Sequence, residues 1–104
     1  MSKKIINTNN APAPIGPYNQ AVLAGNLLFI SGQIALIPGT TELNNADIAT
    51  ETRQVMENLE AILSAASADF SHVVKTTIFL SDMSLFAEVN QIYGRFFESD
   101  YPAR

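Results

Sequence analysis

One long amphipathic segment constrains the fold more than any other feature of the chain. From Ile48 to about Ala68, apolar side chains recur at spacings of three and four residues, and Asp47 directly precedes them. This period is typical of a helix with one buried face, and aspartate is a favoured N-cap residue. The expected buried positions are Ile48, Thr52, Val55, Leu59, Ile62, Leu63 and Ala66. The expected polar positions are Glu51, Gln54, Glu57, Asn58 and Glu60.

Four short segments have the composition of β-strands. They are residues 4–7, 18–24, 27–34 and 73–80. Gly25 and Asn26 predict a hairpin turn between the second and third segments. Three prolines between Pro12 and Pro17 remove backbone donors and fix φ, so we expect residues 9–17 to be extended rather than helical.

A second amphipathic segment follows the last predicted strand. Asp82 or Ser84 can cap a helix that runs from Met83 or Leu85 to about Glu98. Its expected buried stripe is Phe86, Val89, Tyr93, Phe96 and Phe97. The predicted order is therefore β-β-β-α-β-α, an α+β fold with two helices packed on one face of a small mixed sheet.

The other face of this sheet is also apolar. Phe29, Val73 and Phe79 are expected there, where neither helix can reach them. Exposed apolar surface costs about 25 cal/mol per Å², which makes an uncovered face of this kind unfavourable. We therefore expect a partner subunit to cover it.

Composition excludes several classes of partner. The 104 residues form a single predicted domain, 1–104, with a net charge of −4 and six lysines and arginines in total. Nucleic acids and anionic membranes are recognised by basic surfaces, so neither is expected as a partner. The chain has no cysteine, and its first residues lack the apolar run of a signal peptide. We expect a cytoplasmic protein.

The familiar catalytic motifs are absent, and a few polar residues in apolar settings remain as candidates. The single His72 precedes a strand in a polar connection and is expected to lie on the surface; no metal site is predicted. Ser31 and Gly32 interrupt an apolar strand, where serine can bond the backbone and glycine can mark a close approach. Tyr18 and Asn90 allow either a structural or a site role.

Five blocks of sequence together resemble the RidA/YjgF family of reactive-intermediate, or enamine/imine, deaminases. The blocks are Ala13–Tyr18, Phe29–Ile34, Val74–Leu80, Phe86 with Val89 and Asn90, and Tyr101–Arg104. They occur in the family's order and spacing across nearly the whole chain. The resemblance implies a chorismate-mutase-like fold and a homotrimer whose sheets face inward, with clefts between subunits.

The resemblance also implies an activity. Family members hydrolyse 2-aminoacrylate-type enamines and imines to 2-keto acids and ammonia, without a metal or an organic cofactor. By similarity, Arg104 would hold the substrate carboxylate, which a planar guanidinium can grip with two hydrogen bonds. Ser31 and Gly32 would line the cleft, Tyr18 would form its wall, and Asn90 would complete it.

The resemblance implies further chain beyond Arg104. Family members continue with a final strand or strand pair and a glutamate that orients the water. We therefore expect the native protein to continue past Arg104. Glu88, Glu98 and Asp100 are nearby acids, but their spacing marks none of them as a substitute.

Two other function classes stay open at this stage. One is a non-catalytic trimer that binds small carboxylates, such as 2-keto acids, through the same Arg104. The other is RNA cleavage or translation inhibition, a role sometimes attached to the family, against which the acidic composition counts.

Overall fold

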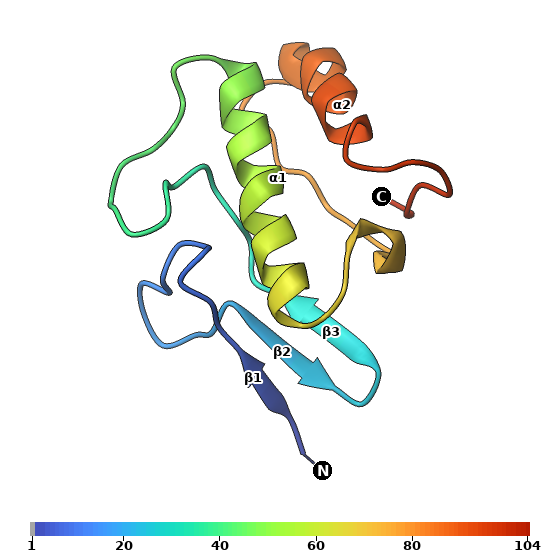
Figure 1. Ribbon diagram of the computed structural model, residues 1–104. Helices are drawn as coiled ribbons and strands as arrows, with labels where there is room; N and C mark the ends of the chain where they lie inside the picture. The colour runs from blue at the N-terminus through green and yellow to red at the C-terminus, as the bar shows by residue number, and fades with distance from the viewer. Residues whose placement is uncertain (1) are drawn as a thin grey trace.

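A three-stranded antiparallel sheet and two α-helices make up the computed structural model, which describes residues 2–104. The strands are β1 (Lys4–Ile6), β2 (Ala21–Ala24) and β3 (Leu27–Ile30), in the spatial order β1-β2-β3. The helices are α1 (Ile48–Ala65) and α2 (Phe86–Gly94), with short 3₁₀ turns η1 (Phe70–His72) and η2 (Met83–Leu85). The sheet lies at the end of the molecule that holds the N-terminus, and α2 lies at the opposite end (Figure 1).

The register of the sheet separates a covered face from an open one. Ile6, Ala21 and Ile30 occupy one row across the three strands and pack with Ile62 of α1. The adjacent row is Ile5, Val22 and Phe29. Successive residues of a strand point to opposite faces, so this second row faces away from α1, and its Phe29 is 61% exposed. The open apolar face expected from the sequence is present in the single chain.

The predicted first helix is confirmed, with an earlier end. Asp47 caps α1 by accepting a hydrogen bond from the Thr50 amide at 2.7 Å. The helix ends at Ala65 rather than near Ala68 because Ser67 has a φ of 59°, in the left-handed region. The Ala68 amide then donates to the Leu63 carbonyl at 2.9 Å, which closes a Schellman motif.

The predicted polar face of α1 contains one error. Asn58 is 1% exposed, whereas its polar side chain placed it on the outer face in the sequence prediction. Its Nδ2 donates to the carbonyls of Ile34 and Leu36 at 3.1 and 2.9 Å, and its Oδ1 accepts from Gln54. The amide is buried because it ties the chain leaving β3 to the helix.

The strand predicted over residues 73–80 is not formed as a ladder in this chain. Its one bridge is a parallel pairing of Lys75 with Ala103, so the parallel component of the predicted mixed sheet is limited to this contact. A strand requires paired backbone groups along its length, and residues 77–80 lack them among residues 2–104. Val73, expected on the open face, packs against the core, whereas Phe79, which was also expected on that face, is 92% exposed.

The second helix is shorter than predicted. Asp82 accepts from the Ser84 amide and begins the turn η2, which leads into α2. The helix ends at Gly94 rather than near Glu98, and three successive amides then bond carbonyls three residues back. Phe96 and Phe97 thereby reach Phe70, with ring centroids 5.6 and 5.2 Å from its own.

No helix within residues 2–104 combines the length and the apolar character needed to cross a bilayer.

Candidate functional site

A cleft of about 240 Å³ opens between the extended segment that follows Val73 and the first turns of α2. Its apolar lining consists of Ile78, Leu80, Met83, Phe86 and Val89. Its polar lining consists of Lys75, Thr77, Asn90 and Arg104. None of these lining residues is acidic, and two are cations, so the cleft suits a small anion with an apolar part.

Arg104 and Asn90, both candidates from the sequence, are brought together in this cleft. The Nη2 of Arg104 donates to the Oδ1 of Asn90 at 2.6 Å. The guanidinium carbon lies 5.5 Å from the ring centre of Phe86 and 5.0 Å from that of Tyr93. A cation within about 6 Å of an aromatic ring centre is attracted by the ring's quadrupole. The arginine is therefore held by α2, although its side chain is exposed.

The backbone before Arg104 is fixed by the extended segment. The Thr76 amide donates to the Ala103 carbonyl at 2.9 Å, and the Ala103 amide donates to the Val74 carbonyl at 3.0 Å. These two bonds form the parallel bridge between Lys75 and Ala103. They place Arg104 at the mouth of the cleft.

Tyr18 lies in a different part of the chain. Its hydroxyl accepts from the Ile15 amide at 3.1 Å, and its own amide donates to the Gly16 carbonyl. Gly16 has a φ of 133°, a conformation that favours glycine. The glycine at this position therefore allows the tight turn before Tyr18. Tyr18 is 48% exposed and is not part of the cleft lining.

A buried glutamine fixes the proline-rich segment that leads to Tyr18. Gln20 is 2% exposed, and its Nε2 donates to the carbonyls of Thr8, Ala11 and Pro12. Its Oε1 accepts from the Thr8 amide at 2.6 Å. The segment is non-helical, as predicted. The buried role of Gln20 was missed, because no local pattern distinguishes it from an exposed glutamine.

Ser31 and Gly32 lie beside the main chain of this second group. The Ser31 hydroxyl donates to the Asn19 carbonyl at 2.6 Å, which is the structural alternative considered for this serine. Its oxygen keeps the capacity to accept a hydrogen bond. Gly32 is exposed, and a Cβ built on it would meet no atom within 4 Å. In one chain the candidate residues thus lie in two separate groups, which are Arg104 with Asn90, and Tyr18 with Ser31 and Gly32.

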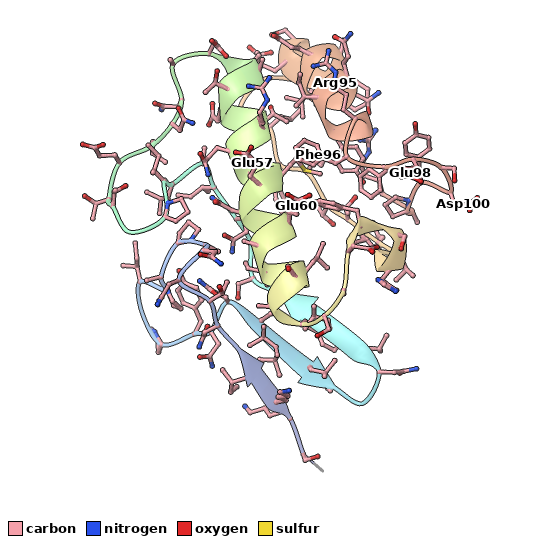
Figure 2. All side chains as sticks on the ribbon, in the orientation of Figure 1. Glu57, Glu60, Arg95, Phe96, Glu98 and Asp100 are labelled. Atoms are coloured by element: carbon pink, nitrogen blue, oxygen red, sulfur yellow. The ribbon has the colours of Figure 1, made fainter. Side chains whose placement is uncertain are left out.

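The remaining titratable candidates lie outside the cleft. His72 is on the surface, as predicted, and its Nδ1 accepts from the Asp69 amide at 3.1 Å in a capping box. The Ser71 hydroxyl and amide, which donate to Asp69, lower the pKa of that carboxyl. Glu98 and Asp100 lie on the loop after α2, at the margin of the molecule (Figure 2). Within residues 2–104, no three histidine or acidic side chains come together as metal ligands.

The two aromatic rings beside Arg104 and one lysine of the cleft lining were not identified in advance as part of the site. Tyr93 and Phe86 were predicted as buried helix residues, yet their rings flank the guanidinium. The prediction was right for Tyr93 and wrong for Phe86, which is 44% exposed. The signal was available, because residues 86, 90 and 93 share one helix face by their spacing. Lys75 was placed on a strand face, without a ligand role.

The fold is that of a small α+β protein, and a family model covers most of the chain. The model of the endoribonuclease L-PSP family matches residues 8–104. The chain therefore belongs to this family, which includes proteins named for RutC and for Rid deaminases.

Individual relatives agree over most of their length. A RutC family protein of Pyrococcus horikoshii is 51% identical over 98% of this chain and 81% of its own. The human 2-iminobutanoate/2-iminopropanoate deaminase is 45% identical over 98% of this chain and 74% of its own.

Solved structures of relatives give the same result for the fold. A Rid family protein of Yersinia pestis superposes with a TM-score of 0.95 at 42% identity, over 99% of this chain and 82% of that one. TdcF of E. coli, solved with bound serine, gives 0.91 at 41% identity, over 97% and 81%. The chorismate-mutase-like fold expected from the sequence is confirmed.

Proposed function

We propose that this protein hydrolyses 2-aminoacrylate-type enamines and imines to 2-keto acids and ammonia. The observation that carries the proposal is the Arg104 guanidinium, held by Asn90 at the mouth of a cleft whose lining contains no acidic residue. A substrate carboxylate would pair with the free donors of this guanidinium. The apolar lining would receive the short carbon chain.

The chemistry requires little from the protein beyond positioning. The enamine gains a proton at its terminal carbon and loses one from nitrogen, which gives an imine whose carbon is electrophilic. Water adds to that carbon to give a carbinolamine, a proton moves from oxygen to nitrogen, and ammonia leaves as the carbon–oxygen double bond forms. Holding the carboxylate fixes the imine carbon relative to the attacking water.

We infer that the working unit is a homotrimer. Phe29, on the open face, is 61% exposed, and Phe79 on the extended segment is 92% exposed. Apolar side chains that are exposed in one chain are typical of an interface with a partner. Association through this face would bring Tyr18, Ser31 and Gly32 of one subunit to the Arg104 cleft of its neighbour. Two half-sites that are incomplete in one chain would then form a single site.

A coupled assay tests the activity. A serine or threonine dehydratase generates the enamine, and keto-acid release is followed with and without this protein. Wild-type protein should accelerate release, and Arg104→Gln should not, while both sediment as the same oligomer. Arg104→Lys serves as the matched control, since it keeps the charge but loses the two-donor geometry. Equal acceleration by wild type and Arg104→Gln would contradict the proposal.

A second candidate function is binding without turnover. Glu88, Glu98 and Asp100 are exposed, and none of them lines the cleft, so no carboxylate in the described chain is placed to direct water there. A protein that only binds small carboxylates would show protection from thermal unfolding by 2-oxobutanoate with no acceleration in the coupled assay.

A further inference from the structure

Three side chains of α2 contact the guanidinium of Arg104. They are Phe86, Asn90 and Tyr93, which lie on one face of the helix. The two rings engage the cationic carbon, and the amide engages one nitrogen. The guanidinium is therefore oriented in the absence of ligand, with its remaining donors available.

Tyr93 differs from Phe86 and Asn90 because both its ring and its hydroxyl are held by other residues. It is 7% exposed, and its ring lies 4.9 Å from that of Phe97. Its hydroxyl shares a hydrogen bond of 2.8 Å with the Oγ1 of Thr76. Phe86, by contrast, is 44% exposed and has no polar group to anchor it.

Thr76 connects this ring to the backbone of the arginine. Its side chain bonds Tyr93, and its amide donates to the carbonyl of Ala103, the residue before Arg104. One threonine thus sets both the ring beneath the guanidinium and the main chain from which the guanidinium extends. The guanidinium and the main chain of Arg104 are thereby fixed relative to each other.

We propose that Tyr93, locked by Thr76, is a positioning residue that presents the Arg104 guanidinium to an anionic ligand. The inference rests on the proposed function for the identity of that ligand, a small 2-keto carboxylate. A pre-oriented arginine loses less conformational freedom when it binds, so the carboxylate binds more tightly. Neither Tyr93 nor Thr76 needs to contact the carboxylate for this effect.

The first measurement is independent of the ligand. In NMR spectra, the Hε and Hδ protons of Arg104 should carry an upfield ring-current shift in the wild type. Tyr93→Leu removes the ring and should abolish most of that shift. Thr76→Val and Tyr93→Phe keep the packing and remove the hydrogen bond, so they should increase the mobility of the Arg104 Nε. An Arg104 signal and mobility unchanged in all three variants would overturn the proposal.

The second measurement uses 2-oxobutanoate as the probe and 2-oxobutanamide as its uncharged match. Tyr93→Leu should weaken binding of the keto acid by about ten-fold, and Thr76→Val by about three-fold. Binding of the amide should change little in either variant. Equal losses for acid and amide would indicate a general structural effect and contradict the positioning role. If wild type binds no keto acid, the proposed function fails, while the NMR result still decides whether Tyr93 orients Arg104.

Discussion

The Nη2 of Arg104 donates a hydrogen bond of 2.6 Å to the Oδ1 of Asn90. The bond crosses from the segment after α2 back to the helix, and it fixes one edge of the guanidinium. Charge-assisted bonds of this kind are stronger than neutral ones. The identity of the group at position 90 therefore controls how much of the arginine's charge is available to a ligand.

Substitution of Asn90 should separate orientation from charge. Asn90→Ala removes the tether and should weaken 2-oxobutanoate binding several-fold. Asn90→Asp keeps the contact but neutralises the guanidinium with an internal carboxylate, so it should weaken binding more than Asn90→Ala does. Isothermal titration calorimetry measures both. An Asn90→Asp variant that binds as well as wild type would show that Arg104 is not the anion site.

The buried amide of Asn58 should contribute strongly to stability. Asn58→Leu leaves the carbonyls of Ile34 and Leu36 without partners, at a cost of about 2–4 kcal/mol in the free energy of unfolding. Glu57→Ala, at the exposed position next to it, is the matched control and should change little. Urea denaturation compares the two. Similar midpoints for both variants would contradict a stabilising role for the buried Asn58 amide.

Acid should destabilise the protein through its three capping aspartates. Hydrogen bonds from Thr50 lower the pKa of Asp47, those from Ser71 lower that of Asp69, and those from Ser84 lower that of Asp82. Because these carboxyls bind protons less readily when folded, their contribution is complete above the ordinary aspartate pKa of 3.8 and is lost as pH falls below it.

A triple Asp→Asn variant at these positions tests that dependence. Asparagine is nearly as good a cap but does not titrate, so Tm at neutral pH should stay close to the wild-type value. Between pH 5 and about pH 2.5 the wild-type Tm should fall more steeply than that of the variant. Parallel Tm curves would place the acid sensitivity elsewhere.

The exposed side chain of Phe79 should govern self-association. Phe79→Glu places a charge on a side chain that is 92% exposed in the single chain, so the protomer's own fold should tolerate it. Burying that charge at an interface would be costly. Sedimentation should show trimers for wild type and monomers for Phe79→Glu, with similar circular dichroism. Thr77→Glu places the same charge on an exposed neighbour that lines the Arg104 cleft. If only Phe79→Glu is monomeric, the effect belongs to Phe79 itself, and if both variants are monomeric, it belongs to the segment.

Sequence patterns correctly predicted the elements that are stabilised by interactions between residues close in sequence. The α1 period, the Asp47 cap and the hairpin at Gly25 all depend on neighbours in sequence, and all three are present. The strand over residues 73–80 was wrong as a ladder in this chain, because strand formation needs a partner that composition does not supply. The burial of Asn58 was missed because its carbonyl partners are distant in sequence.

The candidate site was predictable in its residues more than in its geometry. Asn90 was a candidate from its place on the predicted helix, and Arg104 was chosen from a family resemblance. The two form a hydrogen bond in the structure. Tyr18, Ser31 and Gly32 form a separate group, and their joint role with Arg104 remains a prediction about an assembly. The ring of Tyr93 was read only as core, since burial and ligand positioning leave the same apolar signal on a helix face.

Mixing two defective subunits tests the central claim most directly, namely that one site is shared between copies. Arg104→Ala lacks one half-site, and the double variant Tyr18→Ala/Ser31→Ala lacks the other. Each alone should be inactive in the dehydratase-coupled assay. When the two are co-expressed in equal amounts, random trimers should recover about one quarter of the wild-type activity, because that fraction of clefts combines two intact halves. Activity that stays absent after mixing, or a fully active double variant, would contradict a cleft built by two subunits.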